Sequence, residues 1–315
     1  TRGSLLRGKS FEMMDAYSFG KDEIDLNVEY ERIKDAYMEI FSELGLNVQP
    51  VGADSGAIGG AKSEEFMCVS RIGEDNILYD RITGKLINSE LLEKENAKEY
   101  IQKTYGITNL NNLEVRKACE LGHIFQLGEK YSKSMNASYI AADGKQKYYS
   151  MGCYGIGVSR TLAMVYENSL VRNEKNEFSS ISLPINITPY SIYIIAKTDD
   201  ESKLEYAEKM YELLTREGVS VLFDDRDFIS IGAKLKDSKV TGIPYTCVLG
   251  KTLDEGYVTI ENNRFGTKLN VSTDDIVDVL KKFEILRKKK FSIEDIVLQN
   301  TKNMNVQQEN IVKKK

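Results

Sequence analysis

The stretch GCYGIGVSR, at residues 152–160, places three glycines and one arginine within nine positions. It follows QKYYSM, which has the composition of a strand, and it runs into VSRTLAMVYE, where apolar residues recur at the spacing of one helical face. The local order is therefore strand, glycines and helix, with Arg160 in the first turn of the helix. Because the amino end of a helix carries a partial positive charge, an arginine there indicates an anionic or aromatic ligand.

Glycine allows a ligand to approach the backbone closely, since it has no Cβ atom. The G-x-G-x-x-R spacing of Gly155, Gly157 and Arg160 differs from the spacing of a P-loop and from that of a dinucleotide-binding fingerprint. Glycines at a junction of strand and helix also serve as packing or turn devices. The stretch alone leaves both interpretations open, and the rest of the chain has to decide between them.

The composition of the 315-residue chain, with 41% hydrophobic and 29% charged residues, is typical of a globular protein of about two domains. No apolar run has the length of a membrane span, and TRGSLLRGKS lacks the apolar core of a signal peptide, so we expect no membrane partner. The net charge of −5 argues against nucleic-acid binding over the whole surface but allows a local basic patch.

Cysteine and histidine usage restricts the chemistry. The four cysteines form no C-x-x-C pair, so neither a zinc site nor a disulfide framework is expected, and a reducing compartment is favoured. His123 is the only histidine, which excludes a multi-histidine metal site. Nucleophilic catalysis that needs a histidine is limited to this one residue.

The pattern along the chain predicts two domains and a tail. Helical spacing within residues 23–48 and later strand-like segments predict an α+β domain over 1–188, with an antiparallel sheet flanked by helices. Within it, residues 81–113 are polar and irregular, as in a small surface insertion. Strands then alternate with helices, which predicts a small α/β domain over 189–285. Residues 286–315 are rich in Asn, Gln and Lys, which predicts a disordered tail.

Five motifs occur in a fixed order. They are RGKSFEMMDAYSF (7–19), VGADSGAIGGAKSEEF (51–66), ELGHIFQLGEKYS (120–132), GCYGIGVSR (152–160) and DDRDFISIGAKLKDSKVTGIPYTCVLG (224–250). The first four together resemble the catalytic domain of class II aminoacyl-tRNA synthetases, specifically of the bacterial-type prolyl-tRNA synthetase family. The fifth resembles the anticodon-binding domain of that family, and its I-G-x-x-L-K-D pattern is nearer to the mitochondrial members. The resemblance covers roughly residues 1–285.

The resemblance implies an enzyme of protein biosynthesis that uses ATP and Mg²⁺ to convert L-proline to prolyl-adenylate and then transfers the prolyl group to proline tRNA. This chemistry needs no side-chain nucleophile, because positioning and the positive charge of arginine and magnesium would stabilise the reacting phosphates. The resemblance also implies a homodimer and the mitochondrial matrix, with a bacterial cytoplasm as the alternative. A non-catalytic, synthetase-like accessory or tRNA-binding protein is the other hypothesis.

By resemblance, Arg7 and Arg160 would be the catalytic residues and would also bind ATP. Arg7, Phe11 and Asp15 have the R-x-x-x-F-x-x-x-D spacing of the second half of motif 2, so Arg7 would contact the terminal phosphates. Phe11 and Arg160 would cover the two faces of the adenine, although Phe11 could equally be a core residue. The remaining ATP contacts would come from Asp15, Gln126, Gly155 and Gly157.

The proline site would lie on the strand of ELGHIFQLG. His123 and Phe125 would wall the pyrrolidine ring, although a lone histidine on an apolar strand is also common as a satisfied core residue. Glu120 would contact the amino group or a Mg²⁺ ion. In the second domain a basic helix face would bind tRNA phosphates, unless it is simply a solvated face. Its residues are Arg226, Lys234, Lys236 and Lys239.

The chain also departs from the family pattern. Lys9, Ser10 and Met14 replace an Arg, a Glu and a Lys, and Glu64 stands where relatives have the histidine of S-H-E-F. Motif 1, the first half of motif 2 and an initiator methionine are absent, so we expect a truncated chain that is inactive alone and forms an unstable monomer or an aggregate. Residues 81–113 replace a large editing insertion, so clearance of mischarged alanine in cis is not expected.

Overall fold

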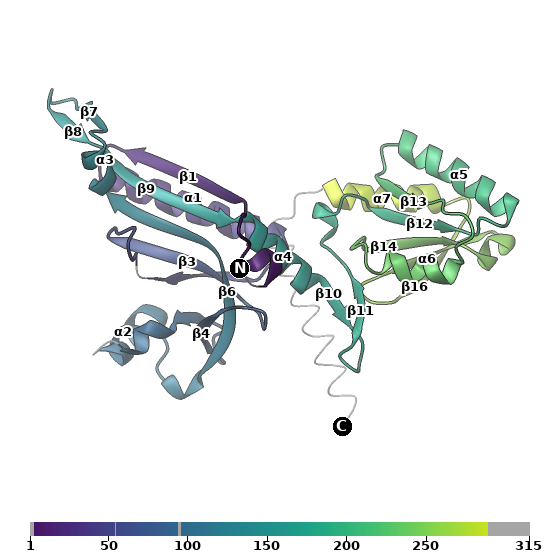
Figure 1. The fold of residues 1–315 in the computed structure, drawn as a ribbon, viewed down its shortest axis with the longest axis horizontal. Coiled ribbons are helices and arrows are strands. Elements are labelled where there is room, and N and C mark those ends of the chain that lie inside the picture. Colours follow the sequence, from purple (N-terminus) through teal and green to yellow (C-terminus); the bar gives the residue numbers. More distant parts are fainter. Residues whose placement is uncertain (1–2, 54, 94–95, 289–315) are drawn as a thin grey trace. The chain divides into compact units, whose positions relative to one another are not determined.

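The computed structural model describes residues 3–53, 55–93 and 96–288 (Figure 1). The chain divides into two compact units, one formed by residues 1–42 and 46–164 and the other by residues 43–45 and 165–315. Each unit is built around one main sheet. The predicted disordered tail began at residue 286, but residues 286–288 form the end of a helix, and the remainder from 289 onward lies outside the described residues.

A single antiparallel sheet organises the first unit, as the sequence predicts. Its strands are, in spatial order, β1 (Met13–Gly20), β9 (Ser150–Gly157), β6 (Leu113–Gly128), β3 (Lys62–Val69) and β2 (Val48–Gly52), with β4 (Asp75–Asp80) paired to β6 and β5 (Leu86–Asn88) paired to β4. The 16-residue strand β6 pairs with β9, β3 and β4. It therefore connects the central part of the sheet to the segment that carries the insertion.

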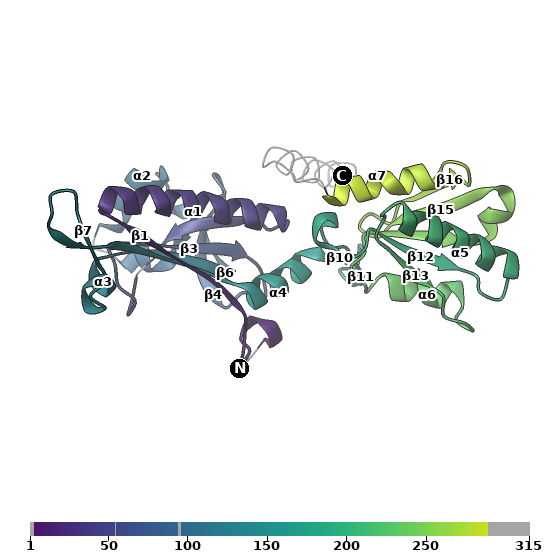
Figure 2. The same cartoon turned by 90° about the horizontal axis from the view of Figure 1, so that it is seen from above.

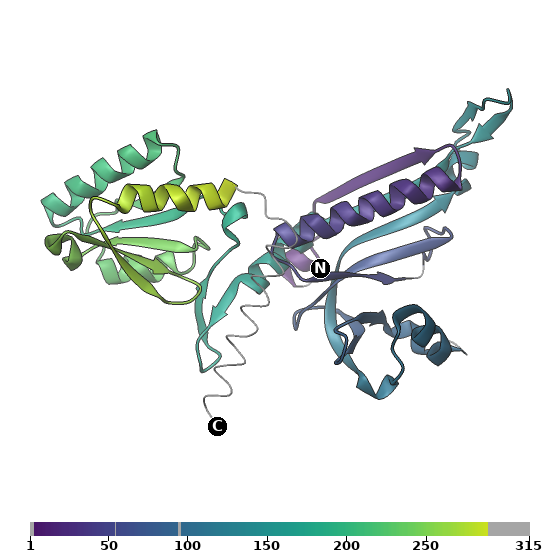
Figure 3. The same ribbon diagram turned by 180° about the vertical axis from the view of Figure 1, so that it is seen from behind.

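Helix α1 (Glu23–Glu43) lies along one face of this sheet (Figure 2, Figure 3). Its buried residues recur at intervals of four or seven, which places them on one helical face. They are Leu26, Tyr30, Tyr37 and Phe41. The Tyr30 ring lies 6.3 Å from the ring of Tyr154 on β9, and the Phe41 ring lies 5.7 Å from that of Phe66 on β3. This packing leaves the other face of the sheet available for a site.

The insertion has a small core of its own. It contains η2 (Ser89–Glu93), α2 (Ala97–Tyr105) and η3 (Leu110–Asn112), and Ile87, Ile101 and Ile107 are buried there with Leu78 of β4. The polar, irregular pattern of residues 81–113 did not indicate this core, because three widely spaced isoleucines supply most of it.

Short elements connect the rest of the chain. In the first unit these are η1 (Ser4–Leu6), α3 (Lys130–Ser134) and the hairpin of β7 (Ser138–Ile140) and β8 (Gln146–Tyr148). Helix α4 (Val158–Ser169) spans the division between the units. In the second unit they are the hairpin of β10 (Leu170–Arg172) and β11 (Phe178–Ile181), followed by η4 (Ile185–Ile187).

The second unit contains a mixed sheet with helices, as predicted for a small α/β domain. The strand order is β13 (Val221–Asp224), β12 (Ile192–Ala196), β14 (Tyr245–Leu249), β15 (Tyr257–Asn262) and β16 (Lys268–Ser272). Strand β12 is parallel to both neighbours, and β15 is antiparallel to both β14 and β16. The helical elements are α5 (Glu201–Arg216), α6 (Ile231–Ser238), η5 (Lys251–Glu255) and α7 (Ile276–Lys288).

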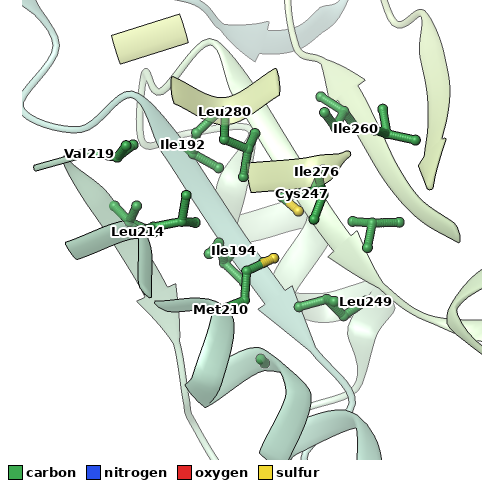
Figure 4. Packing of buried hydrophobic residues seen from close by; sticks show 14 of the residues in the cluster. Ile192, Ile194, Met210, Leu214, Val219, Cys247, Leu249, Ile260, Ile276 and Leu280 are labelled. Carbon is green, nitrogen blue, oxygen red and sulfur yellow. The ribbon is translucent and has the colours of Figure 1, made fainter. Parts of the chain in front are cut away.

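Helices cover both faces of this sheet, which is why every residue of β12 is buried. Ile192 and Ile194 pack in one cluster with Leu214 of α5 and Leu280 of α7 (Figure 4). The residues between them on β12, Tyr193 and Ile195, pack in a second cluster against Ile231 and Leu235 of α6. Alternation along one strand therefore divides the core into two layers.

A buried acid ties the last turn of α7 to the start of the sheet. Glu284 accepts hydrogen bonds from the Ser191 hydroxyl and from the Ser220 backbone N–H, the latter at 3.1 Å. Arg287 pairs with Glu284 at 2.8 Å and also donates to the Thr188 carbonyl at 3.4 Å. The unit therefore needs α7 at least as far as Arg287.

We expect Arg287→Met to lower the free energy of unfolding of the second unit by about 3 kcal/mol, because a buried carboxylate that loses its cation is strongly destabilising. Denaturant unfolding followed by circular dichroism measures this loss. Lys282→Met changes an exposed lysine on the same helix and should have little effect. Equal stability of the two variants would contradict the role assigned to Arg287.

Candidate active site

A cavity of about 670 Å³ lies against the sheet of the first unit. Strands β1, β6 and β9 contribute to it, together with η1 and the first turn of α4. The residues named from the sequence that line it are Arg7, Phe11, Asp15, Glu120, His123, Phe125, Gly155, Gly157 and Arg160. The fold thus brings together residues that are up to 153 positions apart in the chain, counted from Arg7 to Arg160.

The register of the strands creates the hollow. Gly155 on β9 lies opposite Asp15 on β1 and opposite His123 on β6. A Cβ atom at Gly155 would meet Asp15 Oδ1 at 3.4 Å, and one at Gly157 would meet Arg160 Cβ at 3.5 Å, which are ordinary contacts. Neither glycine has a positive φ angle. Packing and turn geometry therefore do not require these two glycines, and the space that they leave belongs to the cavity.

Gly152, in the same stretch, has a different role. A Cβ atom there would lie 2.1 Å from the Tyr154 hydroxyl oxygen, which no relaxation of the backbone could accommodate easily. That hydroxyl is hydrogen-bonded to Ser18 at 2.8 Å on the α1 side of the sheet. Of the two interpretations of the glycines, packing thus applies to Gly152, and an open ligand surface applies to Gly155 and Gly157.

Arg160 is held in place by backbone carbonyls. Its Nη1 donates to the Glu120 carbonyl oxygen at 2.7 Å, and its Nε donates to the Leu6 carbonyl oxygen at 3.4 Å. Nη1 also lies 3.5 Å from the Glu120 carboxylate. The guanidinium at the amino end of α4 is therefore compensated by oxygens of β6 and η1.

His123 sits between an aromatic ring and two carboxylates. Its ring stacks on Phe125 with centroids 3.9 Å apart, and its Nδ1 lies 3.2 Å from Glu120 Oε1 and 3.9 Å from Glu65 Oε1. The Nε2 atom is buried and has no hydrogen-bond partner among the described residues. His123 lines the cavity and leaves this nitrogen unpaired, so it differs from a satisfied core histidine.

The pKa values of the two carboxylates near His123 are shifted in opposite directions. Burial raises the pKa of Glu65 to about 7, and the nearby charge of Glu120 adds to this. Burial also opposes ionisation of Glu120, but the hydrogen bond from His123 and the charge of Arg160 outweigh it and lower the pKa of Glu120. Two carboxylates this close repel one another when both are ionised, and a cation would relieve the repulsion.

The same three side chains fit a small metal site. Ligand atoms of Glu65, Glu120 and His123 lie within 4.8 Å of one another. Mg²⁺ prefers carboxylate oxygens, so Glu65 and Glu120 are its natural ligands here and His123 is not. The structure thus agrees with Glu120 as a candidate magnesium ligand and adds Glu65, which the sequence did not single out.

Further lining residues were not identified from the sequence. Met13 and Tyr17 flank Asp15 on β1, while Cys153 lies on β9 and Ile58 in the glycine-rich loop. The period of two along β1 could have indicated Met13 and Tyr17, because alternate residues of a strand share a face. The approach of Ile58 depends on the loop conformation, which carries no such signal.

Two residues lie away from the cavity. Gln126 donates from its side-chain amide to the Asn27 side chain on α1 at 3.1 Å, because alternation along β6 puts it on the opposite face from Phe125. This corrects the expectation that Gln126 contacts ATP. Glu64 also faces α1, where it accepts hydrogen bonds from Tyr30 at 2.8 Å and Lys34 at 2.6 Å. Its replacement of the family's histidine therefore falls outside the cavity lining.

The second unit has a cavity of about 410 Å³. It is lined by Leu235, Val248, Gly250, Lys251, Thr252, Thr259, Glu261, Lys268 and Asn270. Lys268 pairs with Glu261 at 3.3 Å and its side chain is 61% exposed. An open surface that offers two lysines, an acid and two threonine hydroxyls can bind polar groups such as phosphates and nucleobase edges.

The structure corrects one of the proposed tRNA contacts. Lys234 is fully buried, and its Nζ donates to the carbonyl oxygens of Asp224 at 2.8 Å and Ala196 at 3.4 Å. It supports the sheet and cannot reach RNA, because its position falls on the sheet-facing side of α6. Lys236 is exposed, Lys239 is partly exposed, and Arg226 is engaged by acidic side chains.

Comparisons with known proteins agree with this architecture. Residues 1–169 match the family described as the tRNA synthetase class II core domain (G, H, P, S and T), and residues 191–283 match the anticodon binding domain family. The proline–tRNA ligase of Sulfurimonas denitrificans is 33% identical over 297 residues, which cover 89% of this chain and 67% of that protein. The chain belongs to the class II prolyl-tRNA synthetases.

Other relatives in this family are similarly close. The proline–tRNA ligase of Fusobacterium nucleatum is 29% identical over 91% of this chain and 74% of its own length, and that of Ehrlichia chaffeensis is 33% identical over 89% and 66%. The chain therefore spans about two thirds to three quarters of the length of these three synthetases. Among the described helices of this family member, none combines the length and apolarity needed to cross a membrane.

The buried lysine of this synthetase depends on an unusual aspartate. Asp224 accepts hydrogen bonds from Tyr193 at 2.8 Å and from two nitrogens of Arg226, and Lys234 lies 3.8 Å away. Burial disfavours its charge, but the hydrogen bonds from Arg226 and Tyr193 and the charge of Lys234 prevail and lower the pKa of Asp224 to about 2. Since this folded-state pKa is depressed, the stabilisation is present above about pH 4 and is lost as the pH falls toward 2.

We expect Asp224→Asn to lower the stability of the second unit by about 3 kcal/mol at pH 7, because buried Lys234 and the neighbouring Arg226 lose the carboxylate that pairs with them. The gap from the unaltered protein should narrow as the pH is lowered from 4 toward 2. Denaturant unfolding at a series of pH values tests this, with the exposed neighbour Asp225→Asn as the control. A pH-independent difference would show that ionisation of Asp224 is not responsible.

Proposed function

We propose that the chain acts as a proline–tRNA ligase, which activates proline with ATP and transfers it to proline tRNA. The observation that carries this proposal is the meeting of Arg7, Phe11 and Arg160 with His123 and Phe125 in one cavity. The family membership supports it, since the curated relatives bear that name. The chain also contains a second unit that matches the anticodon binding domain family.

In the first step, a carboxylate oxygen of proline attacks the α-phosphorus of ATP, the bond to the β-phosphate oxygen breaks, and pyrophosphate leaves. The two arginines would supply fixed positive charge for the phosphates, and Arg160 is already oriented by its carbonyl partners. Phe11 is 60% exposed beside the cavity, so its ring is available to stack on the adenine. Orientation of the two substrates then provides much of the rate enhancement.

The proline would occupy the part of the cavity nearest β1 and β6. Tyr17, Phe125 and Cys153 offer apolar surface to a pyrrolidine ring, and Asp15 or Glu120 offers a carboxylate to its secondary ammonium group. In the second step, a terminal ribose hydroxyl of the tRNA attacks the prolyl carbonyl, and AMP leaves.

We also propose Mg²⁺ as the metal ion, held by Glu120 and Glu65. When bound, it would add positive charge beside the phosphates of ATP.

A homodimer is proposed from the family, and the molecular mass of the protein in solution tests it. A mitochondrial location stays a prediction, which imaging of the tagged protein would test.

Recognition of the tRNA is proposed to use the cavity of the second unit rather than the inner side of α6. Lys251 and Lys268 are exposed there, and Glu261 lies between Lys268 and Lys239 with only 9% of its side chain exposed. A lysine attracts backbone phosphate, while a nearly buried carboxylate can accept a hydrogen bond from a base. These groups suit the single-stranded nucleotides of an anticodon loop.

We expect Arg160→Lys to reduce kcat/KM for ATP by a factor that corresponds to about 2–4 kcal/mol, because lysine lacks the planar fork that can stack and bind phosphate together. Proline-dependent ATP–pyrophosphate exchange by the full-length protein measures this. Arg172→Lys changes an exposed arginine on β10 and serves as the control. A near-normal exchange rate in the Arg160 variant would contradict the proposed ATP site, and no exchange by the unaltered protein would favour a non-catalytic tRNA-binding role.

We expect Lys268→Ala to weaken binding of proline tRNA and to make the slope of log affinity against log salt shallower by about one, because one phosphate contact is lost. Lys209→Ala is the matched control, since Lys209 is also an exposed lysine paired with a glutamate but lies on α5. Filter binding at several salt concentrations measures both variants. Equal affinity of the unaltered protein for a tRNA with a changed anticodon would argue against the assignment.

A further inference from the structure

Arg7 has a fixed partner that the proposed function does not use. Its side chain is about half exposed where it lines the cavity, and its Nε forms an ion pair with Glu74. Glu74 itself is not among the residues that line the cavity, and only 19% of its side chain is exposed. The carboxylate therefore reaches the arginine from behind the cavity wall.

The backbone around Glu74 is held firmly against β6. The Ser70 N–H donates to the Lys117 carbonyl at 2.9 Å, and the Gly73 N–H donates to the Ser70 carbonyl at 3.0 Å. A Cβ atom at Gly73 would lie 2.2 Å from the Ala118 carbonyl oxygen, so only glycine fits there. Lys117 Nζ then donates to the Glu74 carbonyl at 3.3 Å. Glu74 is thus anchored to the strand that also carries the candidate proline-binding residues.

The side of the guanidinium that is engaged decides the role of this pair. Glu74 takes Nε of Arg7, and no hydrogen bond joins the Nη nitrogens of Arg7 to a residue of the described chain. A guanidinium can bind a carboxylate with one edge and present its remaining N–H groups to a phosphate. A phosphate in the cavity therefore need not displace Glu74 in order to bind Arg7.

Holding Arg7 in advance has a clear physical benefit. A long, half-exposed arginine samples many rotamers, and fixing it only when the ligand arrives would weaken binding. The negative charge of Glu74 also offsets part of the attraction between Arg7 and a phosphate. If Glu74 only competed with the phosphate for Arg7, it would weaken ATP binding instead of strengthening it. The two roles predict opposite signs when the charge of Glu74 is removed.

We propose that Glu74 is a positioning residue for ATP, which holds Arg7 through Nε so that its Nη nitrogens meet the terminal phosphates. The inference rests on the proposed function. It extends the ATP site to a residue outside the cavity, held by a turn that the close approach of Gly73 to Ala118 anchors to β6.

The test is calorimetric titration of the full-length protein, in Mg²⁺ buffer, with α,β-methylene-ATP and with AMP. Glu74→Gln should weaken binding of the ATP analogue roughly tenfold, as expected for loss of one charge-assisted contact, and should leave AMP binding unchanged. Glu114→Gln removes a carboxylate from another arginine pair on β6, with Arg116, and should change neither affinity. Glu74→Asp keeps the charge and should restore part of the affinity for the ATP analogue.

A double-mutant cycle with Arg7→Gln isolates the coupling. If Glu74 acts through Arg7, Glu74→Gln should cause no further loss of affinity for the ATP analogue in the Arg7→Gln background. Unchanged or tighter binding of the analogue by Glu74→Gln would overturn the inference, as would an equal loss for AMP or additive losses in the cycle. If Glu74→Gln does not fold, Glu74→Asp replaces it. The inference would then be overturned if Glu74→Asp bound the ATP analogue and AMP with the same affinity ratio as the unaltered protein and its effect were additive with that of Arg7→Gln.

The unaltered protein distinguishes the two levels of the proposal. Binding of the analogue and proline-dependent exchange by the unaltered protein, combined with no effect of the Glu74 variants, would overturn only the positioning role. Absence of both binding and exchange in the unaltered protein would overturn the proposed function and the positioning role with it.

Discussion

The register of β9 between β1 and β6 is the constraint on which the candidate active site depends. It places Gly155 between Asp15 and His123, so that a residue without a side chain lies at the centre of a polar surface. A slip of one residue in either pairing would turn those side chains toward α1. The aromatic contacts between α1 and the opposite face, such as Tyr30 with Tyr154, hold this register in place.

Charges at the site are arranged so that each arginine already has an oxygen partner. Arg160 is held by backbone carbonyls, and Arg7 is held by a carboxylate that lies behind the cavity wall. Preorganised charge costs little reorganisation when a phosphate arrives, which is the general advantage of such sites. The glycines matter for the same reason, because they let the ligand come close to groups that do not move.

The second unit separates support from recognition. Its buried ionic groups, Asp224 with Lys234 and Glu284 with Arg287, lie near the ends of strands and fasten helices to the sheet. The lysines of its cavity are exposed instead. A buried cation is restrained by its counter-charges, whereas an exposed one can exchange water for a phosphate, so charge type alone does not identify the recognition surface.

The sequence alone was enough to predict the class of fold. Alternating apolar residues and the alternation of strands with helices are local signals, and the order of the motifs agrees with them. The apolar run of β12 and the helical spacing of α1 are visible in the linear sequence, and both elements formed within the segments for which strands or a helix were predicted. The candidate active-site residues could also be named from the resemblance, including Arg7, His123 and Arg160. Most of these residues line one cavity.

Only the tertiary structure decided which face each of those side chains occupies. Gln126 and Lys234 carry suitable chemistry, but strand alternation turns one toward α1 and helix packing buries the other. Glu65 and Glu74 carried no sequence signal that separated them from other acids, because their importance comes from partners 55 and 67 positions away, Glu120 and Arg7 respectively. Such long-range pairs are set by the order in which strands pair within the sheet, and no local pattern in the sequence encodes that order.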